Sequence, residues 1–336
     1  MRKFAITAAV VAAAALALTG CSGQSTPEST GAATAVDTVK DVQIIVPADP
    51  GGGWDQTGRA ISKVVVDEKL VGSAPVTNIG GAGGTVGLAK LANEKDPHTL
   101  MVTGLVMVGA QELNKSASRI ADTTPIARLT EEPLVVVVPK DSPYKTLKDL
   151  VEGIEKDGQK VTVTGGSAGG ADHILAGLLL GKAGLGQADI AEKLNYVPNS
   201  GGGEAVTMLL GGNAKAGISG VGEFAEFVKD GSLRALAVSS DQASALLPDV
   251  PTITKAGYDV VLTNWRGILA PGGITAAQKS ALTALATSFA ASDAWRAVLA
   301  DKAWSDAFLA GDEFDAFVKE NVTDVTKTLK NIGLVR

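Results

Sequence analysis

The chain has 336 residues, of which 45% are hydrophobic and 20% charged, a composition typical of a globular protein rather than a disordered one. Its formal net charge is −6 and only 14 residues are aromatic (seven Phe, four Trp and three Tyr), which argues against a basic, stacking groove for nucleic acid. One cysteine and two histidines, His98 and His173, exclude an internal disulfide and disfavour a metal site built from several thiolates or imidazoles, and no cofactor is expected.

Residues 1–20 have the pattern of a signal peptide: Arg2-Lys3, an apolar run to Leu18, and small residues before Cys21. The run is shorter than the roughly 20 residues that span a bilayer. Leu-Thr-Gly-Cys resembles the lipobox of bacterial lipoproteins, which implies cleavage before Cys21 and lipid on its thiol; the alternative is an incidental cysteine. Cleavage would leave 28 basic and 36 acidic residues, a net charge of −8. We expect an extracytoplasmic protein anchored to the cell membrane, with residues 21–40 as a flexible tether.

After residue 40 the sequence repeats one pattern, in which a short β-branched run leads into a glycine-rich loop and then an amphipathic stretch. This alternation predicts an α/β protein with mainly parallel sheets. The unbroken apolar run Leu134–Val138 is typical of a strand in a sheet covered on both faces. The predicted strand and helix pairs are 42–46 with 56–70, 75–79 with 85–93, 161–164 with 171–180, 194–197 with 204–210, and 214–219 with 223–229.

The glycine-rich loops contain neither a complete G-x-G-x-x-G motif nor a P-loop motif, so they do not indicate a nucleotide site. Glycine lets a backbone approach a ligand closely, and a helix N-terminus offers unpaired N–H groups to an anion. Ordinary turn chemistry explains any one such loop. Five together favour an anion site, because ligands of α/β proteins bind at the carboxyl ends of the strands.

Several stretches resemble the substrate-binding proteins of tripartite tricarboxylate transporters. They are IIVPADPGGGWDQTGRA at 44–60, NIGGAGGTVGLAKLA at 78–92, TGGSAGGADHILAGLL at 164–179, YVPNSGGGEAVTMLLGGNAKAGISGVGEF at 196–224, LRALAVSS at 233–240, LPDVPTITKAGYD at 247–259 and NWRGILAPGGIT at 264–275. The third and fourth are most similar to the branch associated with citrate-like tricarboxylates. One departure is Asp96-Pro97-His98-Thr99, where the family commonly has Asp-Gly-Tyr-Thr.

The resemblance implies a type II periplasmic-binding-protein fold, with two α/β domains and a ligand cleft between them. Domain 1 would comprise 41–137 plus 238–336 and domain 2 would comprise 138–237, with the crossings acting as a hinge. The implied function is a monomeric receptor, not an enzyme, that captures a small di- or tricarboxylate. The implied partners are that carboxylate, with a citrate-like ligand expected, and the membrane components of the transporter.

The candidate ligand-binding residues are mainly donors and glycines of the loops. They are Gly51, Gly52, Gly53, Trp54, Asp55, Gly83, Gly84, Ser167, Ala168, Gly169, Gly170, His173, Ser200, Gly201, Gly202, Ser219 and Arg266. The hydroxyl groups of Ser167, Ser200 and Ser219 are expected to donate hydrogen bonds.

Four of these residues have a structural interpretation as well. Asp55 either orders its loop as a helix cap or reaches the site, and Trp54 either packs or forms a wall of the cleft. His173 either caps its helix or contacts a ligand carboxylate, which would raise its pKa. Arg266 either contacts the ligand or forms a salt bridge near the hinge. Arg59, one turn inside its helix, is expected to be a structural partner.

Two other functions remain alternatives. Gly165-Gly166-Ser167-Ala168-Gly169 matches the G-x-S-x-G nucleophile motif of α/β-hydrolases. That fold needs a histidine well downstream, yet the only one after Ser167 is His173, so a serine hydrolase is disfavoured. The other alternative is a surface lipoprotein that binds no small molecule.

Overall fold

The computed structural model describes residues 39–335, which all belong to one compact unit. The predicted signal peptide, Cys21 and most of the predicted tether lie outside the described residues. Within this described part of the chain, every helix is too short or too polar to cross a membrane.

Strands and helices alternate along most of the chain. The strands are β1 (Gln43–Val46), β2 (Val76–Asn78), β3 (Thr99–Gly104), β4 (Thr124–Pro139), β5 (Thr162–Gly165), β6 (Asn195–Pro198), β7 (Ala216–Gly220), β8 (Leu233–Val238), β9 (Thr263–Ala270) and β10 (Ser305–Ala310). The α-helices are α1 (Gly53–Asp67), α2 (Thr85–Ala92), α3 (Leu105–Leu113), α4 (Leu147–Asp157), α5 (Ala171–Lys182), α6 (Gln187–Lys193), α7 (Gly202–Leu210), α8 (Val221–Lys229), α9 (Ala276–Ala290), α10 (Asp293–Lys302) and α11 (Asp312–Asn331). Short 3₁₀ helices are η1 (Ala82–Gly84), η2 (Ile120–Asp122) and η3 (Gly158–Lys160). The predicted strand–loop–helix units are confirmed, with ends that shift by a few residues.

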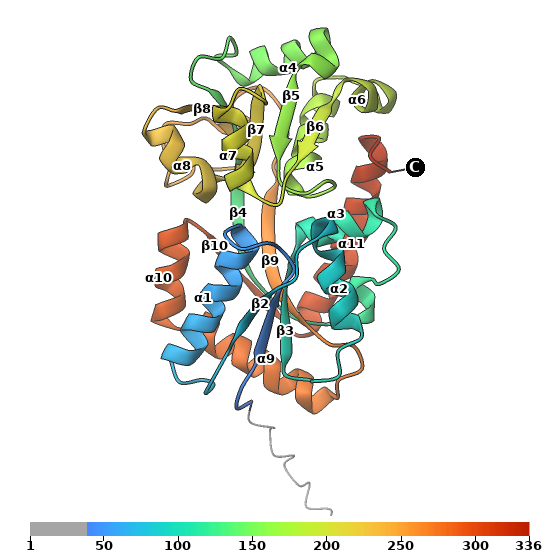
Figure 1. Cartoon of the computed structure of the whole chain (residues 1–336), viewed down its shortest axis with the longest axis vertical. Helices are drawn as coiled ribbons and strands as arrows, with labels where there is room; N and C mark the ends of the chain where they lie inside the picture. The colour runs from blue at the N-terminus through green and yellow to red at the C-terminus, as the bar shows by residue number, and fades with distance from the viewer. Residues whose placement is uncertain (1–38, 336) are drawn as a thin grey trace, which may run out of the picture. The chain divides into compact units, whose positions relative to one another are not determined.

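The strands form two groups that share β4. The first group contains β1, β2, β3, β9 and β10 with residues 124–133 of β4, and the second contains β5 to β8 with residues 134–139 of β4. Figure 1 shows β4 and β9 running between the two groups. β4 changes its partners between Pro133 and Leu134, slightly before the predicted boundary at 137/138. The division into two domains at the predicted residues stays a prediction.

Parallel pairing holds for only part of the sheet. β1 pairs in parallel with β2 and β3, and β5 pairs in parallel with β6 and β7. By contrast, β4 is antiparallel to β7, β8, β9 and β10, and β3 is antiparallel to β9. The expectation of mainly parallel sheets is therefore wrong for the crossing strands, because the chain runs along β4 in one direction and returns along β8 and β9 in the other.

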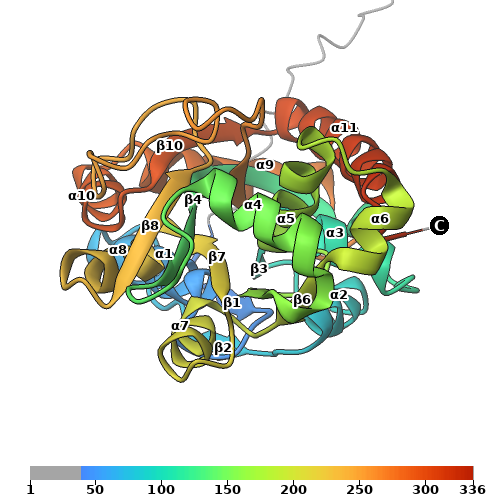
Figure 2. The same ribbon diagram turned by 90° about the horizontal axis from the view of Figure 1, so that it is seen from above.

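The apolar run of β4 is buried from both sides. Val136 and Val138 belong to the large core cluster that includes side chains of α4 and α5, whereas Val135 and Val137 pack with side chains of α7 and α8. Successive side chains of a strand point to opposite faces, so this alternation means that both faces are covered. Figure 2 shows α4 and α5 on one side of β7, and α7 and α8 on the other. The prediction of a sheet covered on both faces is confirmed.

The helix α1 sets the position of the first glycine loop. Its buried face carries Ile61, Val64 and Val65, at the spacing of one side of a helix. At Gly58 a Cβ atom would overlap the Val46 side chain, so the glycine lets α1 lie directly against β1. The N-terminus of α1 is thereby held at the carboxyl end of β1.

Candidate functional site

A cavity of about 430 Å³ lies between the two strand groups, at the carboxyl ends of the parallel strands. Its walls come from the loops that follow β1, β2, β5, β6 and β7, with side chains of α3 and β9 completing them. The volume is within the range of about 300–1,000 Å³ that small-molecule sites usually have. The two groups approach closely here, since a Cβ atom at Gly52 would lie 3.6 Å from the Ser200 carbonyl oxygen.

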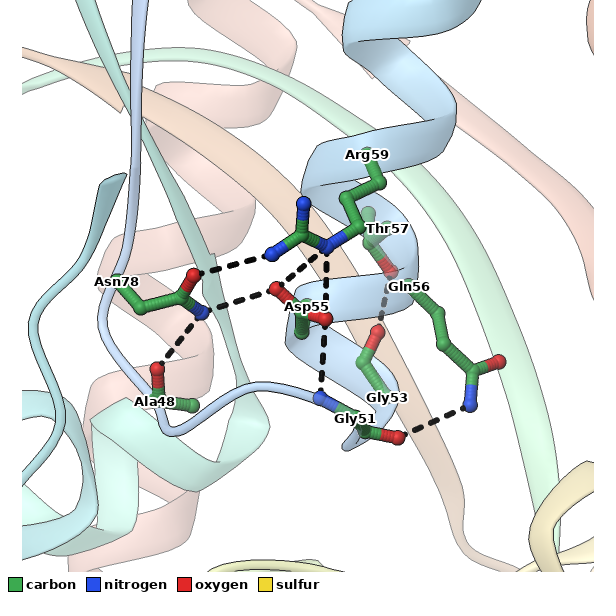
Figure 3. A network of polar contacts seen from close by, with 8 residues as sticks. All are labelled: Ala48, Gly51, Gly53, Asp55, Gln56, Thr57, Arg59 and Asn78. Atoms are coloured by element: carbon green, nitrogen blue, oxygen red, sulfur yellow. Dashed lines mark hydrogen bonds and ion pairs between the residues drawn. The ribbon is translucent and has the colours of Figure 1, made fainter. Parts of the chain in front are cut away.

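The first loop is held by Asp55, which is 4% exposed, is absent from the cavity lining and lies in a polar network (Figure 3). Its carboxylate accepts hydrogen bonds from the Gly51 N–H at 2.9 Å, from Asn78 Nδ2 at 2.9 Å and from Arg59 Nε at 2.9 Å. Burial tends to raise the pKa of Asp55, but the bonds from Arg59, Asn78 and Gly51 together lower it. Asp55 therefore orders the loop, and the expected structural pairing of Arg59 is confirmed.

The loop after β5 is fastened by the next helix in the same way. The Gly166 N–H donates to Asp172 Oδ2 at 2.6 Å, and the Gly169 N–H donates to His173 Nδ1 at 3.2 Å. The His173 ring stacks on Tyr196 with centroids 4.1 Å apart. Burial lowers the pKa of His173 to about 4, so its ring is neutral at pH 7 and accepts the loop hydrogen bond. The structure thus gives His173 the capping role, away from the cavity wall.

Two glutamates fasten the remaining loops. Glu204 Oε2 accepts from the Ser200 N–H at 2.9 Å, and Glu223 Oε1 accepts from the Gly202 N–H at 3.2 Å. Glu223 Oε2 also accepts from the Ser219 hydroxyl at 2.6 Å. That bond uses the only hydroxyl proton of Ser219 in this structure, and the expected donation from Ser219 to a ligand stays a prediction.

These side chains leave a defined set of loop N–H groups without a partner among the described residues. In the loop after β5 they belong to Ser167 and Ala168, and in the loop after β6 to Gly201. In the first loop they belong to Gly52 and Gly53, at the start of α1. All five residues line the cavity. Donors from both strand groups therefore converge on one volume, as an anion site requires.

Trp54 is both packed and part of the wall. It is 8% exposed and lines the cavity, and its ring lies against η1. A Cβ atom at Gly84 would be 2.6 Å from Trp54 Cζ3, and Gly84 has a φ of +90°. Glycine is therefore required at Gly84 for space and for backbone conformation alike. Both predicted interpretations of Trp54 hold at once.

Arg266 lines the cavity from β9 and is only 2% exposed. Its Nη2 pairs with Glu132 Oε1, and the other Glu132 oxygen accepts from Trp304 Nε1 at 2.9 Å. The Nε and Nη1 atoms of Arg266 have no hydrogen-bond partner among the described residues. The guanidinium lies directly against Gly53. A Cβ atom at Gly53 would overlap Nη2 of Arg266, so this position must lack a side chain. The salt-bridge interpretation is confirmed, and two buried nitrogen atoms of Arg266 are left without a partner in the described chain.

The charged groups on the wall are mainly acidic. Asp49, Asp172, Glu204 and Glu223 line the cavity, whereas Arg266 is the one basic residue among the lining residues of the described chain. Burial, opposed by the Gly166 hydrogen bond and reinforced by Glu223 and Glu132, raises the pKa of Asp172 to about 8. Burial likewise raises the pKa of Glu132, against the pull of the Arg266 charge. The wall therefore offers an anion local donors rather than a net positive charge.

The predicted site residues fall into two sets. The cavity is lined by Gly52, Gly53, Trp54, Gly83, Gly84, Ser167, Ala168, Ser200, Gly201, Ser219 and Arg266, but not by Gly51, Asp55, Gly169, Gly170, Gly202 or His173. The residues of the second set share one feature: they hold the loops or cap the helices behind the wall, with polar groups that are already paired. For example, Gly169 has a φ of +75° and turns towards Leu113 of α3. Their binding to a ligand stays a prediction.

Other residues also line the cavity and were not predicted from the sequence. They are Pro47, Ala48, Asp49, Gly81, Ala82, Val106, Asn114, Gly166, Asp172, Pro198, Asn199, Glu204, Gly220, Glu223 and Asn264. Most flank the same loops, so extending each loop by two residues would have found them. Asp172, Glu204 and Glu223 had a signal too, since each is an acid in the first turn of a helix that follows a glycine loop. Val106 on α3 and Asn114, which directly follows α3, had no such signal.

The hydrolase alternative finds no support in this geometry. His173 Nδ1 is occupied by the Gly169 N–H and its ring is stacked on Tyr196. A general base must reach the hydroxyl whose proton it takes, and no hydrogen bond joins His173 to Ser167 in the described residues. Those residues also lack any group of three or more His, Cys, Asp or Glu placed to hold a metal ion.

Comparison with known proteins identifies the relatives of the chain. Residues 60–334 match the family described as "Tripartite tricarboxylate transporter family receptor". A curated protein of Agrobacterium vitis, the "UPF0065 protein in the TAR-I ttuE-ttuC' intergenic region", is 33% identical over 235 residues. That alignment covers 68% of this chain and 65% of the relative, slightly less than two thirds of its length.

Solved structures show the same fold. The periplasmic binding protein BugD superposes with a TM-score of 0.78 at 22% identity, covering 88% of this chain and 98% of BugD. Two proteins of Rhodopseudomonas palustris, MatC with bound malate and Rpa4515 with adipate, give TM-scores of 0.74 and 0.79 at 24% and 20% identity. They cover 87% and 88% of this chain, and 99% and 97% of their own chains. The expected α/β periplasmic-binding-protein fold is confirmed.

Proposed function

Because the chain belongs to the tripartite tricarboxylate transporter receptor family, whose members are binding proteins rather than enzymes, we propose that it captures a small di- or tricarboxylate outside the cytoplasm. It then delivers this ligand to the membrane components of its transporter. Domain closure around the ligand is the only change that this function requires of the protein.

One observation carries the proposal: residues with unpaired N–H groups line one cavity from both strand groups. Ser167 and Ala168 offer two consecutive donors, Gly201 offers a third, and Gly52 and Gly53 offer the N-terminus of α1 from the opposite side. A ligand with two separated carboxylates can engage both sides at once. Such a ligand would favour the arrangement in which the two strand groups lie close together.

Side chains add to the backbone donors. Ser167 and Ser200 line the cavity with hydroxyl groups, and Arg266 has two unpartnered guanidinium nitrogens. A carboxylate bound beside Arg266 would gain a charge-assisted hydrogen bond. The bound malate of MatC and the adipate of Rpa4515 support a carboxylate ligand here.

The acidic wall favours a ligand of low charge. Each additional ligand carboxylate meets repulsion from Glu204 and Glu223, whereas the basic side chain on the wall, Arg266, is already paired. We therefore expect dicarboxylates such as malate or adipate to bind more tightly at neutral pH than citrate-like tricarboxylates.

A thermal-shift screen tests the function. Malate, adipate, citrate and tricarballylate are compared with adipamide, which has the length of adipate without its charges. A ligand at 100 times its Kd adds about 2.7 kcal/mol to the stability of the native state, which raises the Tm by several degrees. Stabilisation by an acid but not by adipamide is expected. Stabilisation by adipamide alone, or by none of the acids, would contradict the proposal.

The lipid anchor is a separate part of the proposal and is supported by Leu18-Thr19-Gly20-Cys21. Replacement of Cys21 with Ala should prevent lipid transfer, leaving uncleaved precursor or released protein. A Cys21→Ala protein that is processed and retained at the membrane like the wild type would show that the anchor is wrongly assigned.

A further inference from the structure

We propose that Asp172 is a ligand-binding residue that carries a proton while a carboxylate occupies the cavity and donates it to that carboxylate in a hydrogen bond. This assignment rests on the proposed function, and it makes ligand capture a proton-coupled event.

The position of Asp172 beside the unpaired loop donors is the first observation. Asp172 lies in the first turn of α5, is 8% exposed and lines the cavity. Its Oδ2 atom accepts from the Gly166 N–H at 2.6 Å. The next two N–H groups along the loop, those of Ser167 and Ala168, have no partner among the described residues. A ligand carboxylate bound by those two groups therefore lies directly beside the Asp172 carboxyl group.

Two carboxylates in such close contact cannot both remain ionised without a cation between them. Arg266 is the one basic residue on the cavity wall of the described chain, and its single charge is already balanced by Glu132, so it does not neutralise a second carboxylate pair. One of the two carboxyl groups must then hold a proton. Asp172 is the better site for it, since it is buried, whereas a ligand carboxylate gains from the loop N–H groups when it is charged.

Among the other titratable groups around Asp172, the two acidic ones favour its protonated form and only Arg266 opposes it. Glu223 of α8 and Glu132 of β4 are acidic and raise the pKa of Asp172, while Arg266 of β9 lowers it. Tyr196 of β6 donates its hydroxyl to the Gly166 carbonyl, and burial raises its pKa well above 10. His173 is neutral above pH 5 or so, because burial lowers its pKa to about 4.

The balance of these effects sets the pH range of the coupling. In the free protein the pKa of Asp172 is raised to about 8, chiefly by burial. The positive end of α5 favours ionisation, but that effect is small beside the effect of burial. A bound carboxylate raises the pKa further. Below about pH 8 Asp172 is therefore already protonated and affinity is constant. Above about pH 8 binding takes up a proton, and affinity falls by up to tenfold per pH unit.

This arrangement also determines selectivity. A protonated carboxyl group donates a hydrogen bond to an anion without adding positive charge, as a neutral acid does in other buried sites. A neutral analogue such as adipamide carries no negative charge, so its amide group would not raise the pKa of Asp172. We therefore expect proton uptake with carboxylate ligands only.

Calorimetry tests the assignment with whichever of malate, adipate, citrate and tricarballylate stabilises the protein most. Titrations at pH 7.5 and 9.0, in two buffers of different ionisation enthalpy, measure the protons taken up per ligand. The wild type should take up clearly more protons at pH 9.0 than at pH 7.5, and its affinity should fall about tenfold. Asp172→Asn, which resembles the protonated side chain in shape and can still donate, should take up none and should bind more tightly than the wild type at pH 9.0.

Asp189→Asn is the matched control, since Asp189 is an exposed acid in the first turn of α6, outside the cavity wall. It should keep the proton uptake of the wild type. Binding by the wild type without proton uptake at pH 9.0 would overturn the assignment, whether or not Asp172→Asn folds. Identical pH profiles for Asp172→Asn and the wild type would also overturn it. Failure of all four acids to bind would instead overturn the proposed function, and this assignment with it.

Discussion

Arg266 and Glu132 form an ion pair in which each side chain is 3% exposed, and this pair joins β9 to β4 beside the point where β4 changes its partners. The Arg266 guanidinium also lies over the Trp304 ring, with Cζ 5.0 Å from the ring centroid. One residue of the pair lines the cavity and the other lies behind the wall at Gly220. The pair therefore links the strands that cross between the two groups to the site itself.

Removal of the charge on Glu132 should destabilise the fold. In Glu132→Gln the buried Arg266 loses its ionic partner, and breaking one side of a buried pair costs about 3 kcal/mol or more. Urea denaturation measures the loss. Glu131→Gln, one residue earlier, keeps a hydrogen-bond acceptor for Thr263 and should cost less than about 1 kcal/mol. Equal stabilities for the two variants would show that the Arg266–Glu132 pair contributes little.

A side chain at Gly52 should block ligand binding without unfolding the protein. Gly52 has a φ of −79°, so its backbone tolerates valine, but the new side chain would press against the Ser200 carbonyl and Gly201 across the cavity. We expect at least tenfold weaker binding by calorimetry and little change in the Tm. Gly203→Val is the control, because nothing lies within 4 Å of that position. Unchanged affinity in Gly52→Val would remove this loop from the site.

Loss of the Asp55 carboxylate should weaken both the first loop and the ligand affinity. Asp55→Ala leaves the Gly51 N–H and Asn78 without their acceptor, which should cost about 1–3 kcal/mol of stability. The hydrogen bonds outweigh burial and lower the pKa of Asp55 in the folded state. The contribution of its carboxylate to the free energy of unfolding is therefore complete above about pH 4 and is lost as the pH falls through the folded-state pKa.

Denaturation at pH 7 and at pH 3 checks this dependence. Asp67→Ala serves as the comparison, since Asp67 is an exposed acid at the end of α1 that pairs with Lys63. This substitution should change the free energy of unfolding by less than about 0.5 kcal/mol. A stability difference between Asp55→Ala and the wild type that does not shrink towards pH 3 would argue against the charged form as the stabilising one.

Protonation of His173 should destabilise the protein in mild acid. Burial lowers the folded-state pKa to about 4 from 6.5, so the unfolded chain binds the extra proton between these values. The free energy of unfolding is not affected by this titration above pH 6.5, and it declines by about 3 kcal/mol as the pH falls to 4. His173→Gln should show a smaller decline across this range in urea denaturation. It should also leave the pH profile of ligand affinity above pH 7 unchanged; a changed profile there would place His173 at the ligand.

Local chemistry along the chain was enough to predict the strand–loop–helix units and the first set of lining residues. A β-branched run, a glycine loop and an amphipathic stretch each depend on neighbours within about a dozen residues, so their signals are complete in the sequence. Gly52, Ser167 and Gly201 were found in this way. The family resemblance supplied the two-group fold, which short-range patterns alone do not determine.

Only the tertiary structure decided which loop donors remain free. The Gly166, Gly169 and Ser200 N–H groups are used by side chains four to six residues ahead, and the Gly202 N–H by Glu223, 21 residues ahead. The Arg266–Glu132 pair joins residues 134 positions apart in the sequence. The antiparallel pairing of β8 and β9 with β4 likewise joins residues that are far apart in the sequence. A hydrogen bond is set by distance and angle in space, and the sequence states which groups can pair but not which of them meet.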